Sequence, residues 1–161
     1  MIFSIDPGNI ESAYTLIDDN LKPKEIGKIP NHEIFDKIQE ALELYNAPIA
    51  IEMIQSFGMG VGQEVFDTCV WVGRFTEYAG EKNVTYVYRK EEKMNLCHSM
   101  RAKDGNIAQA LIDRFAYGVR NRGKGTIKEK GWFYGFADDI WSAYAVGITY
   151  HDLHMKDGAV K

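Results

Sequence analysis

Short apolar runs broken by turn residues open the chain. Residues 1–6 (MIFSID) and 12–17 (SAYTLI) are rich in β-forming side chains, and the segment between them contains Pro-Gly-Asn. Such runs on either side of a turn predict two strands paired as a hairpin. A third, weaker strand is expected near residues 24–29.

The apolar spacing then changes to that of a helix. Ile34, Ile38, Leu42 and Tyr45 fall on one face of a helix that we expect to be capped by Asn31. The helix should run to about residue 45, because an Ala-Pro pair follows and stops it.

The run PIAIEMI (48–54) is nearly all apolar and predicts a central buried strand, which carries one charge at Glu52. Further elements are expected as a strand over 84–88 and as helices over 63–80, 104–116 and 138–151. Asp104 is the expected cap of the second of these helices, and the pair Asp138-Asp139 opens the last one. Residues 118–136 predict a loop rich in Gly, Lys and Arg.

Strands that alternate with helices after an antiparallel opening predict an α/β fold, with a mixed five-stranded sheet covered by helices on both faces. The chain has no internal repeat and no linker-like tract, and its 161 residues can close one sizeable core. We therefore expect a single domain over residues 1–161.

The composition is that of an ordinary globular protein, because 45% hydrophobic and 26% charged residues exclude the disordered and collagen-like classes. No stretch approaches the roughly 18 apolar residues of a membrane span, so no membrane partner is expected. The opening MIFSIDPG lacks the basic region of a secretory signal. With only two cysteines, Cys69 and Cys97, we expect free thiols and a cytoplasmic location.

The charge is segregated along the chain, although the net value is only −4. Residues 1–88 hold 6 basic and 14 acidic side chains, residues 89–130 hold 11 and 5, and residues 131–161 hold 2 and 4. A basic stretch between acidic flanks is expected where carboxylates gather at a metal site beside a surface that binds a polyanion. A solvated loop region would give the same pattern.

Several carboxylates lie in or next to apolar segments, where a buried charge requires a partner. Asp6 ends the apolar first strand, Glu52 lies in the apolar run 48–54, and Asp138-Asp139 open an apolar helix. Burying an ionised carboxylate costs several kcal/mol or more unless it is paired or binds a cation. Carboxylates from two strand ends and a helix start would repel one another and attract Mg²⁺ or Mn²⁺, with a second ion about 3.5 to 4 Å away.

Each of these acids also has a structural interpretation, except Glu52. Asp6 could bond its own backbone in the turn before Pro7-Gly8, and Asp138 or Asp139 could cap the last helix. Neither turn nor cap chemistry explains a glutamate within an apolar strand, so Glu52 favours a functional site.

In this order the motifs resemble those of the RuvC-type Holliday junction resolvases, which belong to the RNase H-like superfamily. SIDPGNIESAYTLID resembles the first strand and turn of that family, IAIEMI its second motif, and FADDIWSAYAVGITYH its final helix. The resemblance is strongest to resolvases of bacteriophages and prophages, in which a Trp such as Trp141 follows the last Asp. It implies an RNase H-like fold and a nuclease in the cytoplasm of a bacterial or phage-infected cell.

The resemblance implies that Asp6, Glu52 and Asp139 are catalytic metal ligands, with Asp138 as a supporting carboxylate. The family usually has two aspartates three residues apart in the last motif, whereas here they are adjacent. Adjacent helix residues point about 100° apart, so both cannot face one ion equally. We choose Asp139 because the residues that follow it are small or apolar in the direction that packs on a sheet.

The resemblance also implies basic residues after the fifth strand, of which Lys93 is the expected catalytic lysine. Expected DNA contacts there are Arg89, Lys90, Arg101 and Lys103, and a mobile arm within 118–136 adds Arg120, Arg122 and Lys124. Phe57, in the loop after Glu52, is expected to stack on a base at the junction centre. The alternatives are a solvated loop for the arm and a core anchor for Phe57.

These features together predict a Mg²⁺-dependent endodeoxyribonuclease that nicks four-way junctions, forks or flaps as a homodimer. On the helix 63–80, Phe66, Val70 and Phe75 are candidates for either core or a dimer face. A non-catalytic module that binds branched DNA is the alternative. An ATP-binding domain of the actin or sugar-kinase kind is disfavoured, since such proteins need two domains to close around ATP.

Overall fold

A five-stranded mixed sheet forms the centre of the protein in the computed structural model, which describes residues 1–56, 58 and 60–156. The strands are β1 (Ile2–Asp6), β2 (Glu11–Ile17), β3 (Pro23–Pro30), β4 (Ile49–Met53) and β5 (Val84–Tyr88). Their order is β3-β2-β1-β4-β5, in which β1, β2 and β3 pair antiparallel and β1, β4 and β5 pair parallel. The predicted α/β fold with an antiparallel opening is confirmed.

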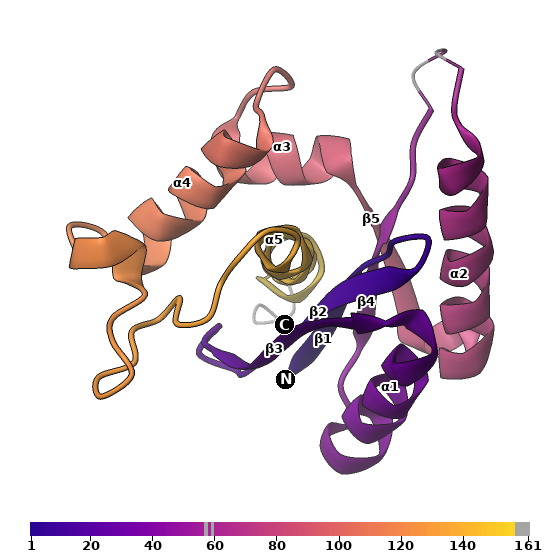
Figure 1. Cartoon of the computed structure of the whole chain (residues 1–161), viewed down its shortest axis with the longest axis horizontal. Coiled ribbons are helices and arrows are strands. Elements are labelled where there is room, and N and C mark those ends of the chain that lie inside the picture. The colour runs from indigo at the N-terminus through magenta and orange to yellow at the C-terminus, as the bar shows by residue number, and fades with distance from the viewer. Residues whose placement is uncertain (57, 59, 157–161) are drawn as a thin grey trace.

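Helices cover both faces of this sheet (Figure 1). They are α1 (Asn31–Tyr45), α2 (Gln63–Ala79), α3 (Arg89–Cys97), α4 (Asp104–Phe115) and α5 (Ile140–Tyr150), with short turns η1 (Glu81–Asn83), η2 (Arg120–Gly123) and η3 (His151–Met155). α1 and α2 lie on one side of the sheet, and α5 crosses the other side with α3 and α4 beyond it. No helix in the part of the chain that the structure describes is long and apolar enough to cross a membrane.

Two apolar cores follow from this layering. Phe3 and Ile5 of β1 pack with Ile34 of α1 and Phe75 of α2 on the first face. Ile2 belongs to the second core, between the sheet and the helices α4 and α5. Successive side chains of a strand point to opposite faces of the sheet, and β1 contributes to a core on each face. This explains why its hydrophobic run is nearly continuous rather than alternating.

α5 packs very closely on the sheet because of Gly147. A Cβ at this position would lie 2.4 Å from Cδ1 of Ile17 and 2.7 Å from Oγ of Ser4. Ser4 itself is fully buried, and its hydroxyl lies 2.7 Å from that of Thr15. This contact fixes the distance of α5 from β1, and therefore the position of the residues that precede the helix.

The sequence patterns did not predict α3. The segment RKEEKMNLC has few apolar residues, so its helical period is weak. A reciprocal cap starts the helix, in which Glu91 Oε2 accepts a hydrogen bond from the Tyr88 backbone N–H at 2.7 Å. α3 then packs against α4 and α5, and these tertiary contacts stabilise a helix whose own sequence has no regular apolar face.

The start of the last helix also differs from the prediction. α5 begins at Ile140, after Asp138 adopts a left-handed backbone with φ of 38°. Neither Asp138 nor Asp139 caps it through a side chain. The expected caps Asn31 and Asp104 are likewise the first residues of their helices, and Asn31 instead bonds Ser12 and Gly8 in a buried network.

The basic loop 118–136 is held on the body of the protein at its aromatic end, and the mobility of its exposed basic part stays a prediction. Phe133 and Phe136 are buried in the second core, and Trp132 stacks on Phe115 with ring centroids 5.0 Å apart. The aromatic residues downstream of the cations hold the loop on the body of the protein. Cys69 and Cys97 are free thiols, as expected.

Candidate active site

Asp6 and Glu52 lie side by side at one edge of the sheet. β1 and β4 run parallel with Ile5 opposite Ile51, so the next residue of each strand is one of the two acids. The carboxyl ends of parallel strands meet at the same edge, and the two carboxyls come within hydrogen-bonding reach of each other. The structure therefore brings together two site residues that lie 46 positions apart in the sequence.

The electrostatics of this pair favour a bound cation. Burial raises the pKa of Asp6 well above its usual range, and the Glu52 carboxylate beside it raises that pKa further. Burial also raises the pKa of Glu52, against the opposing attraction of Arg89. A buried pair in which one carboxylate hinders the ionisation of the other favours either a shared proton or a cation. Their oxygens are the ligands that Mg²⁺ and Mn²⁺ prefer.

Asp139 approaches this pair from a third element, just before α5. Its charge contributes to the raised pKa of both Asp6 and Glu52. Its Oδ2 also accepts a hydrogen bond from Lys28 Nζ on β3 at 2.6 Å. Within residues 1–56, 58 and 60–156, no three His, Cys, Asp or Glu side chains are gathered closely enough to hold one cation. A cation bound by all three acids would require Asp139 to turn away from Lys28.

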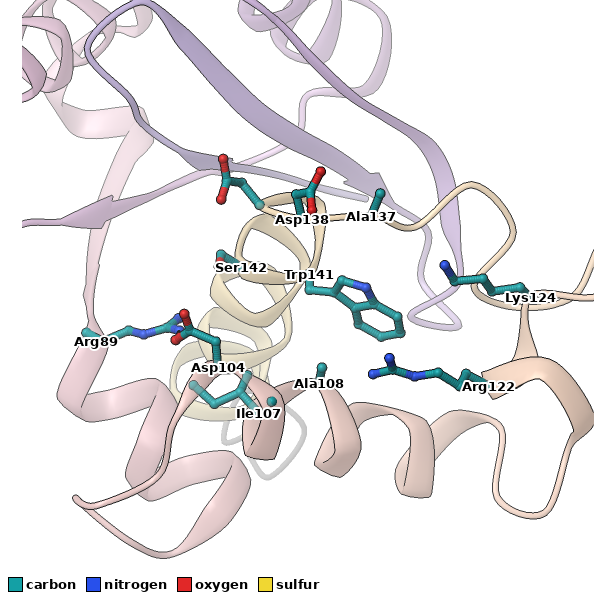
Figure 2. Close-up of a pocket in the computed structure, with 12 residues that line it drawn as sticks. Arg89, Asp104, Ile107, Ala108, Arg122, Lys124, Ala137, Asp138, Trp141 and Ser142 are labelled. Carbon is teal, nitrogen blue, oxygen red and sulfur yellow. The ribbon is translucent and has the colours of Figure 1, made fainter.

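A cleft of about 530 Å³ opens beside the carboxylates, between the start of α5, the start of α4 and the loop after α4 (Figure 2). Asp138 lies on one side of it, and Arg122 and Lys124 lie on another. Asp139, the next residue after Asp138, also lines the cleft. Its remaining lining residues are Arg89, Asp104, Gly105, Ile107, Ala108, Ala137, Trp141 and Ser142. The cleft thus has acidic side chains at the helix starts on one side and a basic surface on the other.

Arg89, the first residue of α3, is held by two acids that the sequence did not indicate as site residues. Its guanidinium donates to Glu92 Oε2 at 2.5 Å and also to Asp104 Oδ1. Burial disfavours its charge, but the carboxylates of Glu92 and Glu52 raise the pKa of Arg89. Glu92 has no solvent exposure, and its Oε1 has no partner among the described residues.

The predicted basic residues separate into two groups. Arg89, Arg122 and Lys124 line the cleft, whereas Lys93 and Lys90 line a neighbouring hollow with Arg89. Arg101 lies against Cys97 in another hollow, and Lys103 and Arg120 are exposed at the starts of α4 and η2; these three are not among the cleft residues. Phe57 lies outside the described residues.

Three further residues of the site were not predicted. Lys28 pairs with an acid 111 positions away, so no local pattern signals it. Glu92 lies on the helix that was missed, although a glutamate one turn after an arginine is a recognisable helical ion pair. Ser142 follows Asp139 by three residues, which places it on the same side of the helix and in the same cleft.

The fold matches that of a known structural class. The chain has the RNase H-like fold of RuvC, with the mixed five-stranded sheet and flanking helices described above. No protein-family model matches the chain, and no curated protein matches its sequence.

Three solved structures are similar along nearly the whole chain. RuvC from Thermus thermophilus in complex with a Holliday junction substrate is 14% identical, with a TM-score of 0.65 over 98% of this chain and 95% of that one. A structure of Thermus thermophilus RuvC is 14% identical, with a TM-score of 0.62 over 92% of each chain. The resolvase of Fowlpox virus, in complex with Holliday junction DNA, is 16% identical, with a TM-score of 0.51 over 94% of this chain and 99% of that one.

Proposed function

We propose that this protein is a metal-dependent endodeoxyribonuclease that cuts Holliday junctions and other branched DNA. The observation that carries the proposal is the pair Asp6 and Glu52, held together at the ends of parallel strands with raised pKa values, beside a cleft with a basic wall. Two structures of similar fold are complexes of resolvases with Holliday junction DNA, which supports branched DNA as the substrate class.

The acids of this site fit a hard divalent cation. Asp6, Glu52 and, after release from Lys28, Asp139 would hold Mg²⁺ or Mn²⁺, with room for a second ion toward the open cleft. Such a cation, when bound, activates a water molecule and stabilises the charge on the phosphodiester. Lys28 is then free to interact with a DNA phosphate, because its Nζ lies beside Asp139 at the edge of the site.

The cations around the cleft orient the DNA. Arg122 and Lys124 lie across the cleft from Asp138, so a phosphate backbone between them meets positive charge on one side and an acid on the other (Figure 2). Arg89 cannot leave easily, since Glu92 and Asp104 hold its guanidinium. It is therefore a fixed positive charge on the side of the cleft near Glu52.

A homodimer would present two such sites to a symmetric junction. α2 offers the surface for it, because Phe66, Val70 and Tyr78 are exposed there while Phe75 is buried in the core. Val70 and Tyr78 border an open apolar hollow together with Gly73, where an added Cβ would meet no atom within 4 Å. A partner helix could approach closely at this glycine.

A junction-binding module without catalysis is the second candidate. The ion pair between Lys28 and Asp139 favours it, since it occupies an acid that the nuclease would need. Ser142, rather than a carboxylate, lies one turn further along the same face. This candidate predicts junction binding that does not depend on divalent cations and is not followed by cleavage.

Cleavage of defined DNA structures distinguishes the two candidates. Purified protein is incubated with a labelled mobile four-way junction, a fork, a flap and a linear duplex, with Mg²⁺, with Mn²⁺ or with chelator. The nuclease predicts metal-dependent nicks in the branched substrates and none in the duplex, and Asp6→Asn should lose the nicks but keep the binding. Equal cleavage by wild type and Asp6→Asn would contradict the assigned site. Binding of the junction without nicks would support the non-catalytic binding module instead.

A further inference from the structure

We propose that the cleft beside the carboxylates is a pocket for one unpaired nucleotide of the branched DNA, whose base stacks on Trp141. The inference rests on the proposed function, since it takes the strand that enters the cleft to be DNA. It adds a base-binding site to what has been described so far as a phosphate-binding surface.

The cleft has the size and the lining that a nucleotide requires. Its volume of about 530 Å³ lies within the range of pockets that enclose small organic ligands. Ile107 and Ala108 of α4, both almost fully buried, form an apolar part of the lining next to the indole of Trp141. Arg122 and Lys124 supply positive charge for the phosphates of the same nucleotide.

The indole of Trp141 is held in position but is not fully enclosed. Its ring centroid lies 4.8 Å from that of Phe133 and 4.9 Å from that of Phe136, so the two buried phenylalanines fix its orientation. Trp141 is nevertheless partly exposed, and it projects from α5 into the cleft (Figure 2). A rigid aromatic side chain that remains accessible is a suitable platform for a base.

Arg122 makes the platform specific for a nucleotide rather than for an apolar ligand. Its guanidinium carbon lies 5.5 Å from the centre of the Trp141 ring, and its side chain is exposed. A guanidinium over an indole can be displaced by a base, or can stack on that base and contact its phosphate. Asp139, whose charge acts on Asp6 and Glu52, also lines this cleft, so a base bound there would lie near the phosphodiester presented to these acids.

An unpaired base is available only in branched or distorted DNA, because a regular duplex keeps its bases stacked and paired. The pocket therefore accounts for a preference for junctions over duplex without any contact to a particular base sequence. Stacking also tolerates all four bases, so the preference concerns structure more than sequence.

The test measures whether loss of one base and loss of Trp141 act on the same contact. A series of four-way junctions is made, each lacking one base within three nucleotides of the branch point, and affinities are measured in chelator by fluorescence anisotropy. For wild type we expect one position at which the abasic site weakens binding about tenfold. Trp141→Leu should bind the intact junction about tenfold more weakly than wild type does. Removal of the base at that position should not weaken the binding of Trp141→Leu any further.

A second variant blocks the pocket without removing the aromatic ring. Gly105 lines the cleft, and an added Cβ there would meet no atom within 4 Å, so Gly105→Leu should fold normally and occupy the space of the base. We expect it to behave as Trp141→Leu does, whereas Lys128→Gln, an exposed cation of the same loop outside the cleft, should retain the abasic effect. Thermal melting of each variant verifies the fold, and Gly105→Leu decides the question if Trp141→Leu is unfolded.

The outcomes separate this inference from the proposed function. Junction binding in which no abasic position matters, or in which the abasic effect is the same in wild type and Gly105→Leu, overturns the pocket alone. No preference for junctions over duplex overturns both the pocket and the proposed function. An abasic effect that Gly105→Leu removes, in a protein that does not cleave, supports the pocket and overturns only the nuclease.

Discussion

The pKa of Glu92 differs strongly from that of a glutamate in water. It has no solvent exposure, and one of its carboxyl oxygens has no partner among the described residues. Burial, and then the charge of Glu52, raise the pKa of Glu92 to about 9, even though Arg89 donates to its other oxygen. Burial therefore opposes the ionisation of this side chain, against the attraction of Arg89.

The raised pKa of Glu92 predicts the direction of a pH dependence. The unfolded chain releases this proton near the ordinary pKa of 4.5, whereas the folded protein keeps it up to about pH 9. Between these values the folded state binds more protons, so its stability falls as the pH rises. Denaturant unfolding at pH 6 and pH 9 should show a smaller loss of stability in Glu92→Gln than in wild type. Equal losses would show that Glu92 is already ionised in the folded protein.

Asp6 predicts a conflict between stability and cation binding. Without a cation, Asp6→Asn removes a buried acid that repels Glu52, so its stability at pH 8 should exceed that of wild type by about 1 kcal/mol. Mg²⁺ should raise the melting temperature of wild type, because binding to the folded state stabilises it, and should raise that of Asp6→Asn much less. An equal response of both proteins to Mg²⁺ would place the cation elsewhere. Melting curves with and without Mg²⁺ provide both results.

At the scale of elements, the folded loop 118–136 determines where the basic side chains stand. Gly123 of η2 is buried with φ of +73°, and a Cβ there would lie 2.5 Å from Cβ of Ala116 and 3.2 Å from the Phe133 ring. Its neighbours Arg122 and Lys124 are the cations of the cleft. The packing of one glycine thus connects the second core to the basic wall of the cleft.

This contact predicts different effects for two glycine substitutions in one loop. Gly118 has φ of +70° with no atom within 4 Å of an added Cβ, so Gly118→Ala should lose only the roughly 1 to 2 kcal/mol of a left-handed alanine. Gly123→Ala should lose about 1 to 3 kcal/mol more, because the methyl group is also crowded. Its junction affinity should fall too, since Arg122 and Lys124 are displaced. Urea unfolding and anisotropy measure the two effects, and equal stability losses would contradict the packing argument.

The same elements show what sequence patterns can and cannot predict. The strands that carry Asp6 and Glu52 were predicted because each is a nearly continuous apolar run bounded by turn residues. Glu52 was singled out because a charged residue inside such a run needs a partner. α3 was missed because its stability comes from α4 and α5 rather than from a regular apolar face. The attachment of loop 118–136 to the second core was not predicted, because Trp132, Phe133 and Phe136, which lie at its end, contact residues distant in sequence.

At the scale of the whole molecule, the charge segregation seen in the sequence becomes a spatial arrangement. Two acids of the first half, Asp6 and Glu52, meet at the ends of β1 and β4, and three cations of residues 89–130 line the adjacent cleft. The order of elements was therefore enough to predict an acidic centre beside a basic surface. The ion pair of Lys28 with Asp139, and the contact of Arg89 with Asp104, join residues far apart in the sequence and had no signal in it.

The exposed apolar surface of α2 predicts the oligomeric state. Val70 is 60% exposed, next to Phe66 at 56%, which is unusual for large apolar side chains on one helix face. If this face joins two copies, Val70→Asp should convert a dimer into a monomer and should uncouple the two nicks of a junction. Leu44→Asp, which changes a 68% exposed residue on α1, is the control and should remain dimeric. Light scattering after gel filtration measures the mass, and a monomeric wild type, or a Val70→Asp dimer, contradicts this surface.

The central claim is that the carboxylates at the ends of β1 and β4 perform cation-dependent cleavage of branched DNA. The most direct measurement is the rate of nicking of a labelled four-way junction by wild type and by Glu52→Gln in Mg²⁺, with binding measured in the same samples. Gln has nearly the shape of Glu but lacks its charge, so the account predicts unchanged binding and a loss of nicking of at least a hundredfold, which corresponds to about 2.7 kcal/mol. Nicking by Glu52→Gln at the wild-type rate would contradict the account.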